Sequence, residues 1–391
     1  MAIVSVSPDV PERIPLSVPV VAESAWIYVK QCLDTGWISS AGAFVGQFEQ
    51  AVARIAGVPH AVATVNGTAA LHVALIAAGV KSGDGVIVPD LTFVASANAV
   101  SYLGAVPILV DVSPGNWQLD LDLLEHYLST ECQAHPQGAV TPDGVRITAI
   151  MPVHVLGNML DIKRLLALAQ RFGLAVVEDS TEALGSTSGG VSAGSFGRVG
   201  AFSFNGNKIL STGGGGMIVT HDAGLAARAR HLTTQAKTQA AEYHHDELGY
   251  NYRLVNVLAA IGVAQAETFP ATLARRRAVD AHYRQALAGV GDITFASVRP
   301  EVNPNGWLTT LRTQQMRGLL AHLAERGIEC RPLWQPMTRL PMYANSIFVS
   351  NEAVSHQLYD ECISIPSSSD LTDSQQERVI ETIREFFRPT R

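Results

Sequence analysis

AVVEDSTEALGSTSGGVSAGSFGRVGAFSFNGNKILSTGGGGMIVT, residues 175–220, is the stretch that decides the fold of this chain. It begins with a short apolar run, residues 175–179, which ends in two carboxylates and is typical of a buried parallel strand. Open α/β sheets bind their ligands at the carboxyl ends of such strands, so we expect Asp179 at a ligand site. A second strand of this kind, residues 201–204, leads into a turn that contains Lys208 and then into consecutive glycines.

Asp179 and Lys208 together have the chemistry that pyridoxal 5′-phosphate requires. The aldehyde of this cofactor needs an amine, and Lys208 lies on a turn whose glycines let the backbone approach a ligand closely. The ring nitrogen needs a carboxylate, because a negative charge beside it favours the protonated ring and makes the ring a better electron sink. We therefore predict that Lys208 holds the cofactor covalently and acts as a general base, while Asp179 pairs with the ring nitrogen.

The competing interpretation is that Asp179 caps a helix and Lys208 lies in solvent, as most isolated charged residues do. Lysine is rare in this chain, and the other lysines occur in helical, turn or polar segments, at Lys30, Lys81, Lys163 and Lys237. Lys208 alone follows a buried-strand pattern. This contrast favours the functional interpretation.

The composition limits the class of protein. With 391 residues, 47% apolar and 16% charged, the chain can bury a large core and leave surface for a subunit interface. The net charge of −7 argues against nucleic-acid binding. The cysteines are scattered, so neither a disulfide framework nor a zinc site is indicated. His244 and His245 have no second ligand cluster nearby in sequence, and no metal is predicted.

The termini and the apolar runs bear on location. Residues 1–21 lack the basic start and unbroken apolar core of a signal peptide, and we expect no uninterrupted apolar span long enough for a membrane helix. We therefore expect a cytoplasmic protein that does not contact membranes. Residues 8–20 are rich in proline and are predicted to form an extended arm.

Strand and helix patterns alternate from residue 61 to residue 220, which predicts an α/β fold with a mainly parallel sheet covered by helices on both faces. Near its start, Asn66, Gly67 and Thr68 join a strand to a helix and could cradle a phosphate on free backbone N–H groups. After residue 220 the pattern becomes helical, and Pro270 should kink or break the long helical stretch. We place the arm and the large domain in residues 1–265 and a smaller C-terminal domain in residues 266–391.

Six short motifs around Lys208 carry a family resemblance. They are Asn66-Gly-Thr-Ala-Ala-Leu71, Pro89-Asp-Leu-Thr-Phe-Val-Ala95, Pro152-Val-His-Val-Leu-Gly157, Glu178-Asp-Ser-Thr-Glu182, Ser203-Phe-Asn-Gly-Asn-Lys208 and Gly249-Tyr-Asn-Tyr-Arg253. In this order, and over most of the chain, they resemble the DegT/StrS-type sugar aminotransferases. The resemblance implies fold type I of the pyridoxal phosphate enzymes, which is aspartate aminotransferase-like: a mainly parallel seven-stranded sheet covered by helices, plus a smaller C-terminal α+β domain.

Two further places sharpen the resemblance: Ile14-Pro-Leu-Ser-Val-Pro19 with Cys32-Leu-Asp-Thr-Gly-Trp37, and Arg331-Pro-Leu-Trp-Gln-Pro-Met337. They are similar to the branch that aminates C4 of a nucleotide-linked 4-keto-6-deoxy-N-acetylhexosamine, in bacillosamine or legionaminic acid biosynthesis. The resemblance implies L-glutamate as the amino donor and a homodimer with shared active sites.

The resemblance also implies roles for individual residues. Gly67, Thr68 and Ser203 would bind the cofactor phosphate, and Asn251 would reach the phosphate of the neighbouring subunit's cofactor. Phe93 would stack on the pyridine ring, although an ordinary core aromatic is an equal alternative. Glu182 stands where many relatives have glutamine near the cofactor, and His154 is either near the ring or a satisfied core histidine. The candidates for the wall of the sugar-nucleotide site are Trp37, Arg331 and Trp334, and a structural role is an equal alternative for each.

Other functions compete with the sugar C4 aminotransferase. Related enzymes aminate other keto sugars, such as an 8-keto octulosonate. Related sugar dehydratases use the same cofactor, but they carry histidine at the position of Lys208. A nicotinamide dehydrogenase or a non-catalytic nucleotide-binding protein could use the glycines at residues 213–216, but no G-x-G-x-x-G motif follows the first strand.

Overall fold

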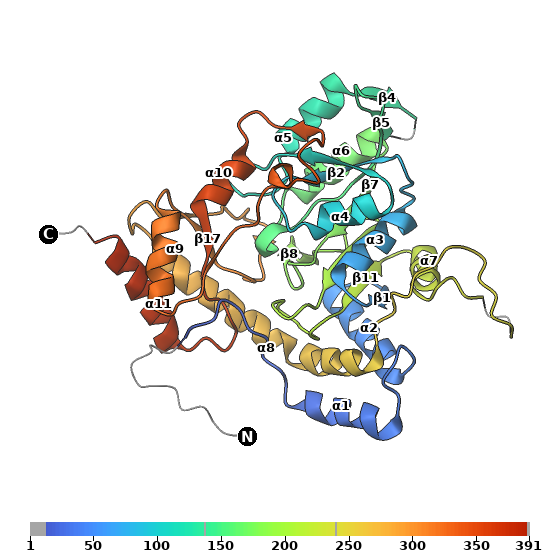
Figure 1. Ribbon diagram of the computed structural model, residues 1–391, viewed down its shortest axis with the longest axis horizontal. Helices are drawn as coiled ribbons and strands as arrows, with labels where there is room; N and C mark the ends of the chain where they lie inside the picture. Colours follow the sequence, from blue (N-terminus) through green and yellow to red (C-terminus); the bar gives the residue numbers. More distant parts are fainter. Residues whose placement is uncertain (1–12, 137, 239–240, 389–391) are drawn as a thin grey trace.

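The computed structural model describes residues 13–136, 138–238 and 241–388, and its centre is a sheet of ten strands (Figure 1). The body of the sheet has the order β1 (His60–Thr64), β11 (Gly216–Thr220), β10 (Val199–Ser203), β7 (Ala175–Asp179), β6 (Arg146–Ile150), β2 (Gly85–Pro89) and β3 (Val106–Val110). β11 is antiparallel to both neighbours, and the other pairs of this body are parallel. The expected mainly parallel seven-stranded sheet and the α/β class are confirmed.

Three short strands extend this body. β16 (Phe348–Val349) pairs in parallel with β3, and β5 (Gly138–Val140) joins β6 to β4 (Gln133–His135). β16 comes from the last part of the chain. The C-terminal segment therefore returns to the edge of the large sheet.

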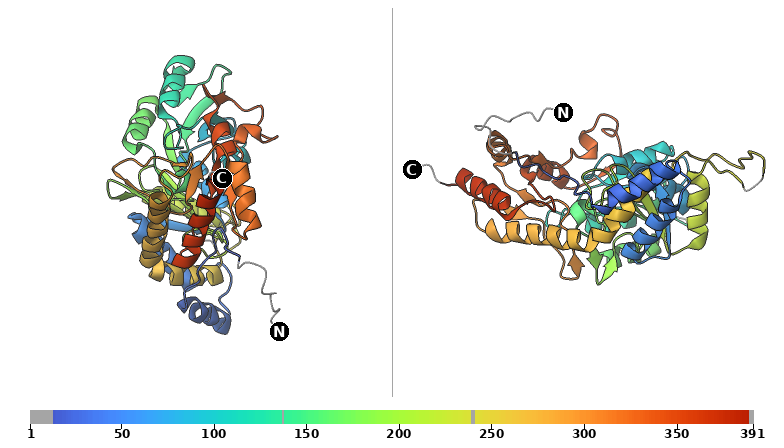
Figure 2. Two further views of the ribbon diagram at one scale, coloured as in Figure 1. Left: turned by 90° about the vertical axis from the view of Figure 1, so that its left-hand side faces the viewer. Right: turned by 90° about the horizontal axis from the view of Figure 1, so that it is seen from below.

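Helices cover both faces of the sheet, because successive side chains of a buried strand point to opposite sides. In β7, Val176 belongs to one apolar cluster and Val177 to the other. The side of Val177 is covered by α3 (Gly67–Ala78), α4 (Ala95–Tyr102) and α7 (Ala223–Thr233), and the side of Val176 by α5 (Leu121–His126) and α6 (Ile162–Phe172) (Figure 2). At the β1 end, α2 (Ala43–Ala56) packs with α8 (Asn256–Ala286) in a third cluster.

The C-terminal part has its own antiparallel sheet and its own core. The sheet has the order β12 (Thr294–Phe295), β14 (Thr310–Arg312), β17 (Cys362–Ser364) and β15 (Arg331–Pro332). The core includes Leu311, Ile363 and side chains of α9 (Met316–Glu325) and α11 (Asp373–Phe386). Several short elements lie outside these sheets. They are α10 (Val354–Glu361), the helical turns η1 (Tyr127–Glu131), η2 (Val155–Gly157) and η3 (Met337–Arg339), and a small sheet of β13 (Val302–Asn303), β8 (Thr187–Ser188) and β9 (Val191–Ser192).

α8 connects the two parts, and Figure 1 shows it running from the large sheet to the C-terminal elements. The expectation is a kink or a break at Pro270; the helix continues through this residue, so a break does not occur. The predicted domain boundary after residue 265 lies inside α8, and the division into two domains stays a prediction. The predicted arm over residues 8–20 is described only from residue 13, where Ile14 pairs with Ile328 of the C-terminal part.

α8 also bears on the predicted absence of a membrane span. By length and composition it is the one helix among residues 13–136, 138–238 and 241–388 that could cross a membrane, which differs from the expectation that no such span exists. The helix packs against α1 (Ser24–Thr35) and α2 and holds the buried Arg276, and 33% of its apolar window is buried. Core helices of soluble proteins pass the same test of length and composition, so this test alone does not establish a membrane span. The cytoplasmic location stays a prediction.

Candidate active site

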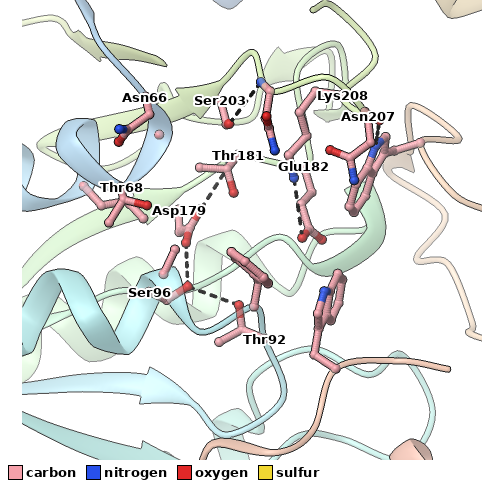
Figure 3. Close-up of a pocket in the computed structure, with 17 residues that line it drawn as sticks. Asn66, Thr68, Thr92, Ser96, Asp179, Thr181, Glu182, Ser203, Asn207 and Lys208 are labelled. Carbon is pink, nitrogen blue, oxygen red and sulfur yellow. Dashed lines mark hydrogen bonds and ion pairs between the residues drawn. The ribbon is translucent and has the colours of Figure 1, made fainter. Parts of the chain in front are cut away.

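A cavity of about 360 Å³ lies at the carboxyl ends of β7 and β10, beside the N-terminus of α3 (Figure 3). It contains both the acid and the lysine selected from the sequence. Its lining consists of Asn66, Gly67, Thr68, Leu71, Thr92, Phe93, Ala95, Ser96, Asp179, Thr181, Glu182, Ser203, Asn205, Asn207, Lys208, Trp307 and Trp334.

Asp179 is the last residue of β7, and its side chain is buried with an exposed fraction of 2%. Its carboxylate is held from two sides. Ser96 Oγ donates to Oδ2 at 2.7 Å, and the backbone N–H of Thr181 donates to Oδ1 at 3.1 Å. Because the strand ladder fixes the backbone and these donors fix the side chain, Asp179 presents a carboxylate of defined direction to the cavity.

Lys208 lies on the turn that follows β10, where its backbone N–H donates to the carbonyl of Asn205 at 2.9 Å. Its Nζ lies 3.8 Å from Oε1 of Glu182 and 4.0 Å from the ring centroid of Trp307. Burial lowers the pKa of Lys208, although the negative charges of Glu182 and Asp179 act in the opposite direction. A lowered pKa makes the neutral amine, which is the nucleophile and the base, more accessible at neutral pH.

Glu182 is buried beside the lysine, and the backbone N–H of Leu156 donates to its Oε2 at 2.8 Å. Burial raises the pKa of Glu182 to about 7, while Lys208 and the Leu156 N–H limit the rise. The carboxyl can therefore hold or release a proton near neutral pH, next to the amine. Leu156 has a left-handed backbone with φ of 58°, which costs energy for a branched residue.

The opposite end of the cavity fits a phosphate. Asn66 caps α3 by accepting a hydrogen bond from the Ala69 N–H at 2.8 Å, and the first N–H groups of a helix have no partner within it. Gly67 and Thr68 occupy that first turn, with Ser203 of β10 opposite. A Cβ on Gly67 would lie 2.7 Å from the Ser203 Cβ, so only glycine allows this close approach. The residues present fit pyridoxal 5′-phosphate: an anion site, an amine and a carboxylate line one cavity.

Eight residues selected from the sequence line this cavity: Gly67, Thr68, Phe93, Asp179, Glu182, Ser203, Lys208 and Trp334. Four other candidates do not line it, and three of these are exposed. Trp37 is exposed, and its carbonyl accepts from the Asn256 side chain. The Arg331 side chain is exposed and pairs with Glu329. Asn251 is exposed and pairs with Thr234. Their predicted roles in substrate binding or across a subunit boundary stay predictions.

His154 lies outside the cavity lining and is fully buried. Its Nε2 is 2.9 Å from Oε2 of Glu178, which also accepts from the backbone N–H groups of Gly194, Phe196 and Gly197. Glu178 and Asp179 are neighbours on a strand and so point to opposite faces of the sheet. This placement favours the interpretation of His154 as a core residue.

The sequence interpretation missed Ser96 and Trp307. Ser96 donates to Asp179, and Trp307 lies over Lys208 and stacks on Trp334 with the two rings 6.3 Å apart and nearly parallel at 9°. The Ser96 signal was present, since it directly follows the quoted motif that ends at Ala95. Trp307 is about a hundred residues from Lys208, and no local pattern connects them.

One cluster of possible metal ligands occurs among the described residues, formed by His231, Asp246 and Glu247. His231 Nε2 lies 2.7 Å from Asp246 Oδ1, and Arg228 forms an ion pair with Glu247. None of these three residues lines the cavity. Its charges are already paired, as in an ordinary surface ion-pair network.

Comparisons with known proteins agree with this geometry. The model of the DegT/DnrJ/EryC1/StrS aminotransferase family matches residues 20–384. The chain is 40% identical over 381 residues to the GDP-perosamine synthase of Caulobacter vibrioides, covering 95% of this chain and 97% of that protein. It is 34% identical over 342 residues to the UDP-N-acetyl-3-dehydro-alpha-D-glucosamine 3-aminotransferase of Acidithiobacillus ferrooxidans, covering 86% of each.

A solved structure gives the same result. The crystal structure of DesV from S. venezuelae superposes with a TM-score of 0.86 at 32% identity, covering 96% of this chain and 100% of that chain. This likeness confirms the expected type I fold. Neither of the two relatives described above is named as an enzyme of bacillosamine biosynthesis. The narrower resemblance to that branch therefore stays a prediction. The chain belongs to the DegT/DnrJ/EryC1/StrS aminotransferase family and is a pyridoxal phosphate-dependent nucleotide-sugar aminotransferase.

Proposed function

We propose that this chain transfers an amino group from L-glutamate to the C4 ketone of a nucleotide-linked 4-keto-6-deoxy sugar. The observation that carries the proposal is the shared cavity, in which Lys208 and Asp179 face the phosphate-binding turn of α3. The motifs at residues 14–19, 32–37 and 331–337 favour an N-acetylhexosamine as the sugar. The similarity to a GDP-perosamine synthase favours a GDP-linked sugar, and both kinds of substrate belong in the test.

The residues that would hold the cofactor have separate roles in this reaction. The bound cofactor supplies the electron sink that stabilises the carbanion at the reacting carbon. Asp179, fixed by Ser96 and the Thr181 N–H, keeps the ring nitrogen protonated. The first turn of α3 and Ser203 anchor the phosphate, so the ring stays in place while its partners change.

Lys208 moves the proton at the reacting carbon, and its surroundings suit that task. Burial lowers the pKa of Lys208, so that the amine accepts a proton readily. Glu182, at 3.8 Å, can take up the proton that the amine releases, since burial raises its pKa to about 7. The Trp307 ring covers the amine and excludes water from it.

The test is to incubate the purified enzyme with nitrogen-labelled L-glutamate and a panel of keto sugars, and to read each product by mass. The panel contains GDP-linked and UDP-linked 4-keto-6-deoxy sugars, an N-acetylated 4-keto sugar, a 3-keto sugar and an 8-keto octulosonate. We expect labelled nitrogen in a 4-keto nucleotide sugar and formation of 2-oxoglutarate. Loss of water without nitrogen transfer would identify a dehydratase, and labelling of the octulosonate alone would refute the nucleotide-sugar assignment.

We further infer that two copies of this chain assemble with shared active sites. Several large apolar side chains of α1 and the loop after it are exposed: Trp26, Ile27, Leu33, Trp37 and Ile38. Isolated apolar side chains are common on protein surfaces, whereas a cluster of this kind is typical of an interaction site. A subunit interface would cover it. Asn251 lies outside the cavity of its own chain, in keeping with a role at a neighbouring site. A monomeric mass in sedimentation equilibrium at micromolar concentration would contradict the assembly.

A further inference from the structure

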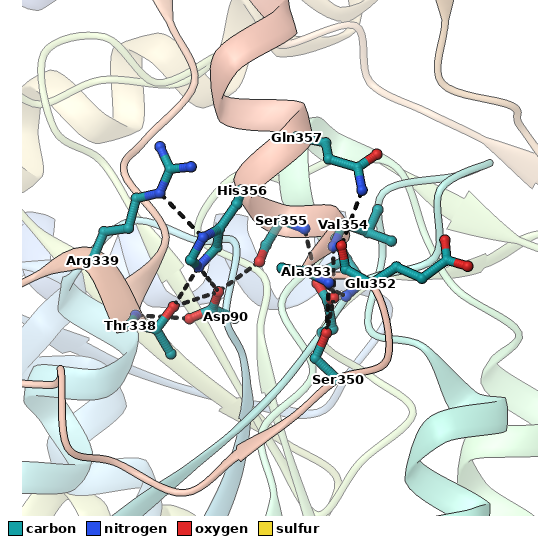
Figure 4. Close-up of polar contacts among 12 residues, drawn as sticks. Asp90, Thr338, Arg339, Ser350, Glu352, Ala353, Val354, Ser355, His356 and Gln357 are labelled. Atoms are coloured by element: carbon teal, nitrogen blue, oxygen red, sulfur yellow. Dashed lines mark hydrogen bonds and ion pairs between the residues drawn. The ribbon is translucent and has the colours of Figure 1, made fainter.

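Asp90 is a buried acid that the transamination does not use. It follows the last residue of β2, has an exposed fraction of 0%, and does not line the cavity. Three donors converge on its carboxylate (Figure 4): the Thr338 N–H at 2.9 Å on Oδ1, and the hydroxyls of Thr338 at 3.1 Å and Ser355 at 2.6 Å on Oδ2. The Asp90 carbonyl also accepts from the Met337 N–H at 2.9 Å.

These contacts join two walls of the cavity. On one side, Asp90 is two residues before Thr92 and three before Phe93, and both of these line the cavity. On the other side, Met337 and Thr338 follow shortly after Trp334, which lines it from the C-terminal part. Leu91 and Leu333, the neighbours of Asp90 and Trp334, lie in one apolar cluster with Trp334 packed against it. Apolar contact holds the walls together without fixing their direction, whereas hydrogen bonds to a carboxylate fix it.

The donors around Asp90 have one consistent arrangement of hydrogens. Arg339 Nε donates to His356 Nδ1 at 3.2 Å, so the other ring nitrogen of His356 carries the hydrogen. That nitrogen lies 2.8 Å from Thr338 Oγ1 and donates to it, which leaves the Thr338 hydroxyl hydrogen for Asp90. Every group that faces the Asp90 carboxylate is therefore a donor. In an Asp90→Asn variant, the side-chain NH₂ group would face at least one of these donors, and that hydrogen bond would be lost.

We propose that Asp90 is a positioning residue that holds Trp334 against Trp307 and so sets the affinity of the cavity for its keto-sugar substrate. The proposal rests on the proposed function for the identity of the ligand, but not for the placement of Trp334. Asp179 lies at the end of β7 and Lys208 on the turn after β10, rather than on the segments that Asp90 joins. Their proton-transfer step should therefore depend little on Asp90.

Asp111 is the matched control. It follows the last residue of β3, is also fully buried, and accepts from Ser350 Oγ at 2.6 Å and from the N–H groups of Val354 and Ser355 at 2.7 and 2.8 Å. It thus anchors the same C-terminal segment through the start of α10. None of these partners lines the cavity, and no lining residue lies within several positions of Asp111 in the sequence. The two carboxylates share Ser355, but in Asp111→Asn the carboxylate of Asp90 keeps both of its contacts with Thr338. Asp111→Asn should therefore destabilise the fold in the same way as Asp90→Asn without loosening Trp334.

The first test uses the cofactor-free protein and near-ultraviolet circular dichroism. The difference between wild type and Trp334→Phe defines the signal of Trp334, whose ring lies 6.3 Å from that of Trp307. We expect Asp90→Asn to lose most of this signal at a temperature well below its unfolding, and Asp111→Asn to retain it. Equal signals in both variants would overturn the proposal. This result does not depend on which sugar the enzyme uses.

The second test uses the holoenzyme and the sugar identified by the panel. Asp90→Asn should raise KM for the sugar about tenfold and change kcat by less than about threefold, because hydrogen bonds to a buried charge have about this effect on binding. Asp111→Asn should change neither constant by more than about twofold. A fall in kcat without a rise in KM would overturn the proposal and indicate that Asp90 acts through Thr92 and Ser96 on Asp179. A Trp334→Phe variant with unchanged KM would show that this wall does not bind the sugar.

Discussion

The two walls of the cavity are built in different ways. On the sheet side, β7 and β10 are parallel neighbours with Asp179 opposite Ala201, so the backbone ladder itself sets the distance from Asp179 to the turn that carries Lys208. On the C-terminal side, Trp334 lies outside the large sheet, and side chains such as Asp90 hold its segment in place. The chemistry therefore rests on main-chain geometry, while substrate recognition rests on side-chain contacts that a few substitutions can change.

The largest expected effect comes from removing the amine on the sheet side. Lys208→Ala should keep the fold and lose at least about 10²- to 10⁴-fold in turnover, the usual cost of a missing general base. Turnover is measured as 2-oxoglutarate formation, with circular dichroism to verify folding. The control is Lys81→Ala, since Lys81 is exposed and its described hydrogen bonds are made by its backbone N–H and carbonyl. Turnover like that of the wild type in Lys208→Ala would show that the sheet side of the cavity does not supply the general base.

The next effect tests the carboxylate and its support separately. Asp179→Asn should bind the cofactor and lose about 10²-fold in kcat, because an amide cannot keep the ring nitrogen charged. Ser96→Ala removes only the donor at 2.7 Å and should cost less than about tenfold. KM for the sugar should change little in both variants. If either variant raised KM and left kcat unchanged, the assignment of chemistry to the sheet side and of substrate recognition to the C-terminal side would be wrong.

The last effect concerns stability and pH rather than turnover. Burial raises the pKa of Glu182 from 4.5 to about 7, so the folded state binds its proton more tightly than the unfolded state does. The contribution of Glu182 to stability is therefore fully present below pH 4.5 and is lost as the pH rises through about 7. Glu182→Gln is neutral throughout and should gain stability relative to wild type across this window, up to about 3 kcal/mol. Calorimetry of the cofactor-free protein measures the difference, and a gain independent of pH would contradict it.

The sequence could predict the sheet side of the site because its signals are local. A buried apolar run before Asp179, glycines around Lys208 and a helix start at Gly67 each follow from neighbours in the chain. The C-terminal wall could not be predicted in this way. Trp307 reaches Lys208, and Thr338 reaches Asp90, only through tertiary packing, and no spacing rule encodes such contacts. The roles of Trp37, Arg331 and Asn251 stay predictions, because they involve a second chain or a substrate.

The pairing of β16 with β3 has a consequence for synthesis of the protein on the ribosome. β3 ends at residue 110, but its outer edge can pair with β16 only after residues 348 and 349 have been synthesised. Until then, the unpaired N–H and C=O groups of β3 are open to pairing with other chains. A chain truncated before β16 should therefore aggregate even though most of the large sheet is present.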